Sequence, residues 1–339
     1  MTDTTVPLDL VVMSSDHNSV GSVAEQAKRA EDRGFSIVTM GETTGWNVVP
    51  VMAVIAERTE RIGIADDVLS PYSRAPTLLG QTLLTLDDIS DGRFRLGLGT
   101  SSPALAERWH SNSFDRPLRR LRETIDIVRN VCEGGEVTYD GEIFDVGGLS
   151  YEQSVPDEQP PIDVAALGPK AVELTGRFAD GWVPQLFTPE GLSERMENLE
   201  RGGELGNRSP SAIRVSPLIR CCVHDDPETA RSLTRQMVAF LIGAYGPFYG
   251  DSIAQQGYER EVERIREAWE TRDTAQMAEE LPDELLDAVA AAGTPSTVRE
   301  KVASFASLEG VDAVRVGFVA GMTQEDKIRT LDALEPLTP

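Results

Sequence analysis

The chain has 339 residues, of which 40% are hydrophobic, and this composition is typical of a globular protein with a sizeable core. Asp and Glu number 56 against 32 Lys and Arg, so the net charge is −24. A surface of this charge repels nucleic acid and anionic membranes, so we expect neither as a partner. No apolar run reaches the roughly 18 residues of a membrane helix. Residues 1–7 lack the parts of a signal peptide, so we expect a cytoplasmic protein.

The cations are mostly arginine, because the chain has only four lysines: Lys28, Lys170, Lys301 and Lys327. The acidic excess runs through the whole chain and is not confined to a tail. We interpret it as adaptation to a high-salt cytoplasm, such as that of a halophilic archaeon, where salt screens self-repulsion. The alternative is a mesophilic protein that is merely acidic.

Cysteine and histidine are too few and too scattered for a disulfide framework or a metal site. The three cysteines are Cys132, Cys221 and Cys222, and none forms a CxxC motif. The three histidines show no metal-ligand spacing, so no metal is expected. These residues fit a reducing, intracellular setting.

Strands and helices alternate along the first 130 residues. Short apolar runs predict strands, and periodic runs between them predict helices. Ser22 and Glu25 have the spacing of a capping box at the start of the first helix. The predicted strands of this half are 8–13, 35–40, 62–69 and 94–98, and the helices between and after them are 20–33, 49–58, 76–89 and 116–131.

The alternation continues to the end of the chain, interrupted by two insertions. Further strands are predicted at 162–166, 181–184, 213–223 and 313–319. Residues 133–160, rich in glycine, predict a hairpin insertion, and residues 226–292 predict a helical insertion that covers the domain or joins it to a second copy. Because strand-helix repeats give parallel strands with right-handed crossovers, eight of them favour one α/β domain over 1–339, a TIM (β/α)₈ barrel with insertions.

In such barrels the active site forms at the carboxyl ends of the strands. Two turns there suit an anion. The glycine-rich turn Gly97–Ser102 lets backbone amides approach a ligand closely. The turn Ala165–Lys170 opens a helix at Pro169, whose free amides and the nearby Lys170 attract phosphate.

Three segments together resemble the bacterial luciferase-like superfamily, and within it the branch that uses the deazaflavin coenzyme F420. They are RFRLGLGTSS at 93–102, AALGPKAVELTGRFADGW at 165–182 and GTPSTVREKV at 293–302. That branch includes glucose-6-phosphate dehydrogenases, secondary alcohol dehydrogenases and methylene-tetrahydromethanopterin reductases. The resemblance covers nearly the whole chain and implies the same barrel.

The resemblance also implies where the coenzyme binds. The segment ADDVLSPYSR is similar to the family's bulge in the third strand, where a cis non-prolyl peptide backs the deazaflavin ring, here between Asp67 and Val68. The remaining residues implied to contact the coenzyme are Ser70 under the ring, Gly99, Thr100 and Ser101 at its linker, and Ala166, Leu167, Gly168, Pro169 and Lys170 at its phosphate.

The usual proton donors of the branch are missing. After the second strand, Glu42 keeps the family's acid, but Thr43 replaces the histidine that follows it. Ser101 and Ser102 fall where the sugar-phosphate dehydrogenases carry a glutamate, and Val11 falls near the first-strand glutamate of the methylene-tetrahydropterin reductases. Glu42 and Asp16 remain as catalytic candidates, and a carboxylate that faces an enclosed ring site is expected to have a raised pKa.

The expected activity is hydride transfer between coenzyme F420 and a small-molecule substrate, best a methylene-tetrahydropterin or folate. Trp46, Tyr72 and Gln185 are the candidates for the substrate pocket. One alternative is a monooxygenase of the same superfamily that uses FMN, and another is a non-catalytic coenzyme-binding protein on the same fold. We expect a homodimer or homotetramer.

Overall fold

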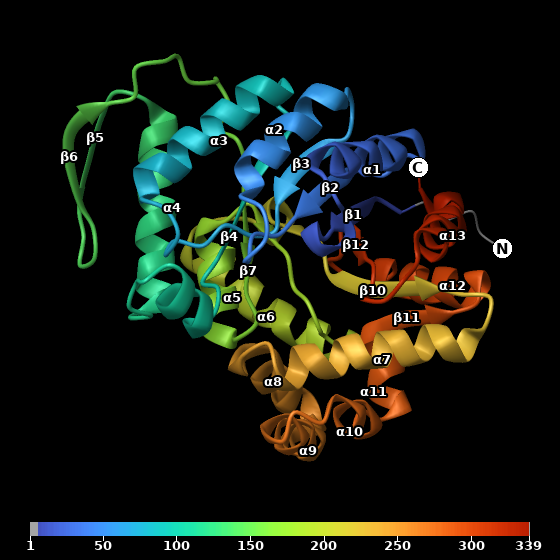
Figure 1. Cartoon of the computed structure of the whole chain (residues 1–339). Helices are drawn as coiled ribbons and strands as arrows, with labels where there is room; N and C mark the ends of the chain where they lie inside the picture. The colour runs from blue at the N-terminus through green and yellow to red at the C-terminus, as the bar shows by residue number, and fades with distance from the viewer. Residues whose placement is uncertain (1–5, 339) are drawn as a thin grey trace.

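Parallel strands alternate with helices in the computed structural model, which describes residues 6–338 (Figure 1). Each strand pairs in parallel with its neighbours, in the order β12-β1-β2-β3-β4-β7-β8-β9. These strands are β1 (Leu8–Val12), β2 (Ile37–Met40), β3 (Gly63–Asp66), β4 (Phe94–Gly99), β7 (Ile162–Ala165), β8 (Gly181–Trp182), β9 (Arg214–Val215) and β12 (Val314–Gly317).

The ring is closed by β10 (Leu218–Val223), which continues β9 after a break at Ser216 and Pro217. On one side, β9 pairs with β8, and Gln185 forms a bridge to Leu218. On the other side, β10 pairs with β12, with Leu218 opposite Arg315. Because β9 and β10 together occupy one position, the ring has eight positions. The predicted (β/α)₈ barrel is therefore confirmed.

Helices surround the ring in Figure 1. Ser19 caps the first of them by accepting a hydrogen bond from the Ser22 amide (3.2 Å), so the capping box expected at Ser22 is wrong. The barrel helices are α1 (Val20–Asp32), α2 (Val48–Arg58), α3 (Pro76–Ser90), α4 (Pro117–Glu133), α5 (Pro169–Phe178), α6 (Pro189–Leu205), α12 (Pro295–Ala306) and α13 (Gln324–Leu334).

Two segments lie outside this pattern. Within 133–160, β5 (Glu136–Asp140) and β6 (Asp145–Ser150) pair antiparallel and project from the barrel in Figure 1. After β10 follow the helices α7 (Pro227–Gly243), α8 (Pro247–Ile253), α9 (Glu259–Glu270), α10 (Thr274–Glu279) and α11 (Asp283–Val289). The segment then ends in a strand, β11 (Ala290–Gly293), which pairs in parallel with β10. The predicted helical insertion 226–292 is therefore wrong for its last residues, 290–292, which form a strand.

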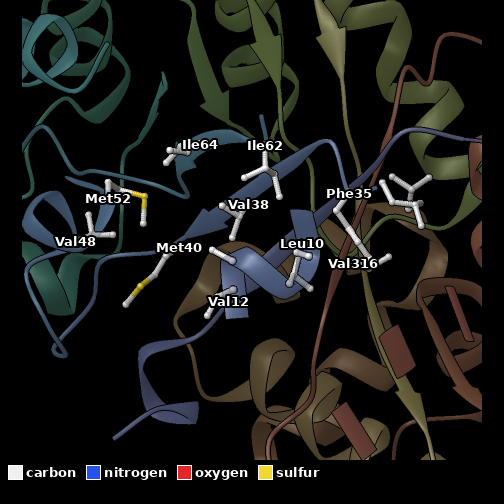
Figure 2. Packing of buried hydrophobic residues seen from close by; sticks show 14 of the residues in the cluster. Leu10, Val12, Phe35, Val38, Met40, Val48, Met52, Ile62, Ile64 and Val316 are labelled. Atoms are coloured by element: carbon white, nitrogen blue, oxygen red, sulfur yellow. The ribbon is translucent and has the colours of Figure 1, made fainter. Parts of the chain in front are cut away.

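The apolar core lies between the strand ring and its helices. Figure 2 shows part of it, where Leu10, Val38 and Ile64 from three neighbouring strands lie in one cluster with Val48 and Met52 of α2. All five side chains are at most 1% exposed. Burying a side chain of this size stabilises the fold by about 1.5–3 kcal/mol relative to leaving it in water.

The inside of the ring is charged, in contrast to the apolar layer outside it. Arg214 donates to both carboxylate oxygens of Asp9 (2.9 and 2.8 Å), and Arg95 donates to both oxygens of Asp163 (2.8 and 2.5 Å). Burial raises the pKa of Asp9, against the opposing effect of Arg214. Asp9, Arg214 and Asp163 line a cavity of only about 10 Å³. Because that volume is about one water molecule, a ligand site has to lie at the mouth of the barrel.

Candidate active site at the mouth of the barrel

The chain forms a bulge where β3 ends, and the peptide bond between Asp67 and Val68 there is cis. This confirms the cis bond implied by the resemblance. Asp66 holds the bulge against β4, because its carboxyl group accepts hydrogen bonds from the amides of Leu69 (2.8 Å) and Gly97 (3.1 Å). Burial raises the pKa of Asp66 well above its usual range, and the neighbouring Asp67 raises it further.

Three glycines leave the space that the bulge fills. A Cβ atom on Gly97 would lie 2.1 Å from the carbonyl oxygen of Asp66, and one on Gly41 would lie 2.5 Å from that of Asp67. A Cβ atom on Gly99 would lie 2.5 Å from Cγ2 of Val68. The strand ends therefore approach the bulge more closely than any side chain allows.

Beyond Gly99, the predicted anion-binding turns lie at the ends of β4 and β7. Ser101 has a positive φ of 62°, so the chain turns sharply after Thr100. Helix α5 begins after Gly168, and no side chain caps its first amides. A Cβ atom on Gly168 would meet nothing within 4 Å. Pro169 and Lys170 are exposed beside this open helix start, whose amides and dipole favour an anion.

The turn before α5 is held by Trp182 of β8. Its indole Nε1 donates to the carbonyl oxygen of Ala166 (2.9 Å), and the Trp182 ring is fully buried. Leu167 packs against the apolar core. Trp182 therefore fixes the turn before α5, and no side chain caps the first amides of that helix.

Glu42 lies at the end of β2 in an ion pair that the sequence analysis missed. Its two carboxylate oxygens accept hydrogen bonds from the Arg74 guanidinium (2.5 and 2.7 Å), and one of them also accepts from the Val48 amide (3.0 Å). Burial acts to raise the pKa of Glu42, but Arg74 and the Val48 amide outweigh it and lower the pKa. The expected raised pKa is therefore wrong, and Glu42 is a carboxylate at neutral pH.

Asp16, the second catalytic candidate, lies after β1 and pairs with Lys327 of α13 (3.2 Å). The Lys327 side chain is only 8% exposed, so this pair is largely shielded from water. The neighbouring His17 shares a hydrogen bond with the Ser22 hydroxyl (3.2 Å), and burial lowers its pKa. Asp16 and Glu42 thus follow adjacent strands, each beside a cation.

The three candidates for substrate contact have different surroundings. Trp46 is half-buried against the core, in the loop before α2. Gln185 accepts a hydrogen bond from the Tyr249 hydroxyl (3.3 Å). Tyr72 is only 2% exposed, and its hydroxyl donates to the carbonyl oxygen of Asp115 (3.0 Å). Phe114 stacks on the Tyr72 ring, so little of Tyr72 is accessible in this structure. Ser70, which the resemblance places under the coenzyme ring, is also buried.

Two buried arginines inside the ring were also missed. Arg315 of β12 donates to the carboxylate of Asp67 in the bulge and is 2% exposed. Arg220 of β10 is 7% exposed. Each lies in a strand whose other residues are apolar or glycine, except for the cysteines of β10, and a charged residue in such a run is the signal that could have identified them.

The described residues contain neither a metal-binding cluster nor a membrane-spanning helix. Within 6–338, no group of three or more His, Cys, Asp or Glu side chains is placed to hold a metal ion. In the same range, no helix is long and apolar enough to span a membrane.

The chain is similar in sequence and fold to several known proteins. The family model described as luciferase-like monooxygenase matches residues 4–312. The chain is 28% identical to the 5,10-methylenetetrahydromethanopterin reductase of Archaeoglobus fulgidus, over 90% of this chain and 91% of the relative. It is 30% identical to a protein of Mycobacterium tuberculosis that is provisionally described as a coenzyme F420-dependent oxidoreductase, over 92% of this chain and 93% of the relative. The solved coenzyme F420-dependent tetrahydromethanopterin reductase of Methanopyrus kandleri has the same fold, with a TM-score of 0.83, 22% identity and 98% coverage of both chains.

Proposed function

The chain belongs to the luciferase-like monooxygenase family, and from this premise we propose that it is an oxidoreductase that transfers a hydride between coenzyme F420 and an organic substrate. The observation that carries the proposal is the bulge at Asp67 and Val68, bordered by three glycines and followed by the open start of α5. The relatives named above support it, because two are described as F420-dependent and the third as a methylenetetrahydromethanopterin reductase.

The residues at the mouth fit the shape and charge of this coenzyme. The glycines let the bulge pack closely against the neighbouring strand ends, where a flat ring can lie on it, and the amides before α5, with Lys170, suit a phosphate. When bound, coenzyme F420 supplies hydride transfer at its deazaflavin ring. The protein then has to position the substrate and provide a proton.

We assign proton transfer to Glu42 and Asp16. Arg74 keeps Glu42 in the carboxylate form, so Glu42 is free to accept a proton when the substrate is oxidised, and its lowered pKa makes it a weak base. In the reducing direction Glu42 first has to take a proton from water. The variants Glu42→Gln and Asp16→Asn separate these roles, since the turnover number falls only for the residue that carries the proton.

For the substrate we propose a methylene-tetrahydropterin or a methylene-tetrahydrofolate, reduced to the methyl form. The reductase of Archaeoglobus fulgidus supports this choice, because it aligns over nearly the whole chain. The assay follows the appearance of oxidised coenzyme F420 at about 420 nm as the reduced coenzyme is consumed with each methylene substrate; secondary alcohols are tested in the opposite direction, by the loss of that band from oxidised F420. Turnover with an alcohol alone would contradict the pterin assignment and leave the coenzyme assignment intact.

The test of the coenzyme itself is a binding titration in high salt with F420, FMN and NADH in parallel. We expect selective binding of F420. FMN is the second candidate, since the matching family model describes monooxygenases. Selective binding of FMN would contradict the proposal and indicate a monooxygenase, which needs oxygen and a source of reduced flavin.

A further inference from the structure

Arg220 is a buried cation for which the described residues provide no counter-ion. The Arg220 side chain is 7% exposed. Its Nη1 donates to the carbonyl oxygen of Phe318 (3.2 Å) and to the sulfur of Met13 (3.6 Å). Within residues 6–338, its Nε is buried without a hydrogen-bond partner. The acids that act on it, Asp67 and Asp16, are each paired with another cation, Arg315 and Lys327.

Such an arrangement is costly. A carbonyl and a thioether compensate a guanidinium poorly, and a buried charge without a partner destabilises a protein. Burial accordingly lowers the pKa of Arg220. A group that costs stability in this way is typical of a functional site, where a ligand supplies the missing partner.

The position of Arg220 points the guanidinium into the mouth of the barrel. Arg220 lies opposite Gly317 in the register of β10 and β12, two residues beyond the pair Leu218 and Arg315. Arg315 lines the interior cavity, and residues two apart in a strand point to the same face. Arg220 therefore points inward, one step closer to the carboxyl end than Arg315.

Two further polar groups lie beside it. Gln185 follows β8 and forms a bridge to Leu218 of β10, and its amide Nε2 is buried without a partner among the described residues. Tyr249 of α8 donates to the other end of that amide (3.3 Å) and is close enough to Arg220 to affect it electrostatically. Unused donors of Arg220 and Gln185 are thus present together on one side of the mouth.

Arg220 lies across the ring from the bulge where the deazaflavin ring is proposed to bind, whereas only β8 separates β10 from β7 and its turn. Three strands separate β10 from β3 in either direction around the ring, and β3 carries the bulge. The turns proposed for the coenzyme follow β4 and β7. A ring that lies against Val68 therefore leaves Arg220, Gln185 and Tyr249 for the molecule that faces it.

We propose that Arg220 binds an oxygen acceptor of the substrate, either a ring carbonyl or a carboxylate, and that Gln185 and Tyr249 complete this acceptor site. This proposal rests on the proposed function, because the molecule bound at Arg220 is the substrate of that reaction. Both sources of the acceptor share one chemistry, an oxygen with partial or full negative charge that takes hydrogen bonds from a guanidinium.

The experiment compares Arg220→Met and Arg220→Lys with the wild type, with Arg329→Met as the control. Arg329 of α13 forms ion pairs with Glu325 of the same helix and with Asp225 of the loop after β10. Arg329→Met therefore changes the net charge by the same amount as Arg220→Met. Two probes separate the sources of the acceptor. 6-Methylpterin carries a ring carbonyl and no carboxylate, and 4-aminobenzoylglutamate carries carboxylates and no pterin. Each is titrated against the F420-loaded protein, and the F420 affinity and melting temperature are measured for every variant.

We expect Arg220→Met to weaken one of the probes about tenfold, or about 1.4 kcal/mol, with the F420 affinity unchanged and the melting temperature equal or higher. Arg220→Lys should restore part of the binding. The probe that weakens identifies the acceptor. Equal loss of F420 affinity would overturn the proposal, since Arg220 would then bind the coenzyme. A lower melting temperature with unchanged probe binding, or failure of both probes to bind the wild type, would also overturn it.

The same titrations keep this proposal distinct from the proposed function. If the wild type binds no F420, the proposed function fails. The probes are then titrated against the coenzyme-free protein, where loss of binding in Arg220→Met supports the acceptor site and unchanged binding contradicts it.

Discussion

Glu42 and Arg74 illustrate how a single contact changes the chemistry of a carboxylate. Both side chains are about 11–12% exposed, and the pair joins the loop after β2 to the loop after β3. Because the guanidinium contacts both carboxylate oxygens, it stabilises the charged form and orients it. The same pair therefore contributes to stability and defines the protonation state at the mouth.

We expect Glu42→Gln to lower the free energy of unfolding by about 2 kcal/mol at pH 7, because Arg74 loses a charged partner. The folded-state pKa of Glu42 is lowered, so its contribution is fully present above the unfolded value of about 4.3 and is lost as the pH falls through the folded value. The difference between variant and wild type should therefore shrink below about pH 4.3. Urea unfolding at several pH values measures it.

Glu57→Gln is the control, since Glu57 is exposed on α2. It should leave the unfolding free energy within about 0.5 kcal/mol of wild type. A Glu42→Gln difference that does not change with pH would contradict the pKa direction.

Local sequence identified the residues whose role depends on their own backbone, and missed those whose role depends on a distant partner. The turn before Lys170 was predicted from its own Gly, Pro and Lys, and the cis bond at Asp67 was implied by the resemblance of one short segment to the family. Arg315 and its partner Asp67 are 248 residues apart, and no local pattern announces such a pair. The pKa of Glu42 could not be predicted for the same reason.

At the scale of elements, the close approach of β4 to the bulge depends on Gly97. We expect Gly97→Ala to lower the unfolding free energy by about 1–3 kcal/mol and to weaken F420 binding, because the new methyl group would force the Asp66 carbonyl away. Gly147→Ala is the matched control, since a Cβ atom there would meet nothing within 4 Å. Thermal unfolding and a coenzyme titration measure both effects, and equal behaviour of the two variants would contradict this account of the bulge.

Helix α5 provides a second test at this scale. We expect Lys170→Gln to weaken F420 binding about fivefold, which is typical of losing one exposed charge near a helix start. Binding of the deazaflavin riboside that lacks the phosphate should not change. Arg177→Gln removes the same charge from the last turn of α5 and should leave both affinities unchanged. Equal weakening of riboside and F420 would show that Lys170 does not contact the phosphate.

The elements that the sequence analysis missed have weak local signals. The strand β11 has the sequence Ala-Ala-Ala-Gly, and alanine is favourable in a helix, so only its pairing with β10 makes it a strand. The strands of the barrel were predicted because buried parallel strands are nearly continuous apolar runs. The single strand predicted at 213–223 is wrong, because the chain breaks at Ser216 and Pro217 between β9 and β10, and proline has no amide to donate to a sheet.

At the scale of the whole molecule, charge dominates. With a net charge of −24, like charges repel across the surface, and we propose that the chain is adapted to high salt. We expect the melting temperature at pH 7.5 to rise by about 5 °C or more between 0.1 M and 2 M KCl, because the screening length falls from about 10 Å to below 3 Å.

The same salt titration at pH 5 is the control. The isoelectric point is about 4.5, so repulsion is smaller there and the rise should shrink. An equal rise at both pH values would indicate a general effect of salt on apolar burial. No rise at pH 7.5 would contradict salt adaptation.

Assembly is the remaining proposal at this scale. We propose a homodimer or homotetramer, and light scattering after size exclusion measures the mass against 36.9 kDa for one chain. Trp109, Leu149 and Phe240 are among the large apolar side chains that one copy leaves exposed. A mass of one chain at micromolar concentration would contradict the proposal.

The pairing of β11 with β10 has a consequence for the segment between them. That segment leaves the sheet after Val223 and returns to it at Ala290, on the adjacent strand, where Val223 lies opposite Gly293. A protease that nicks one of its exposed turns, for example near Arg272, would therefore leave both fragments attached to the same sheet. The two pieces should co-elute under native conditions and separate only in denaturant.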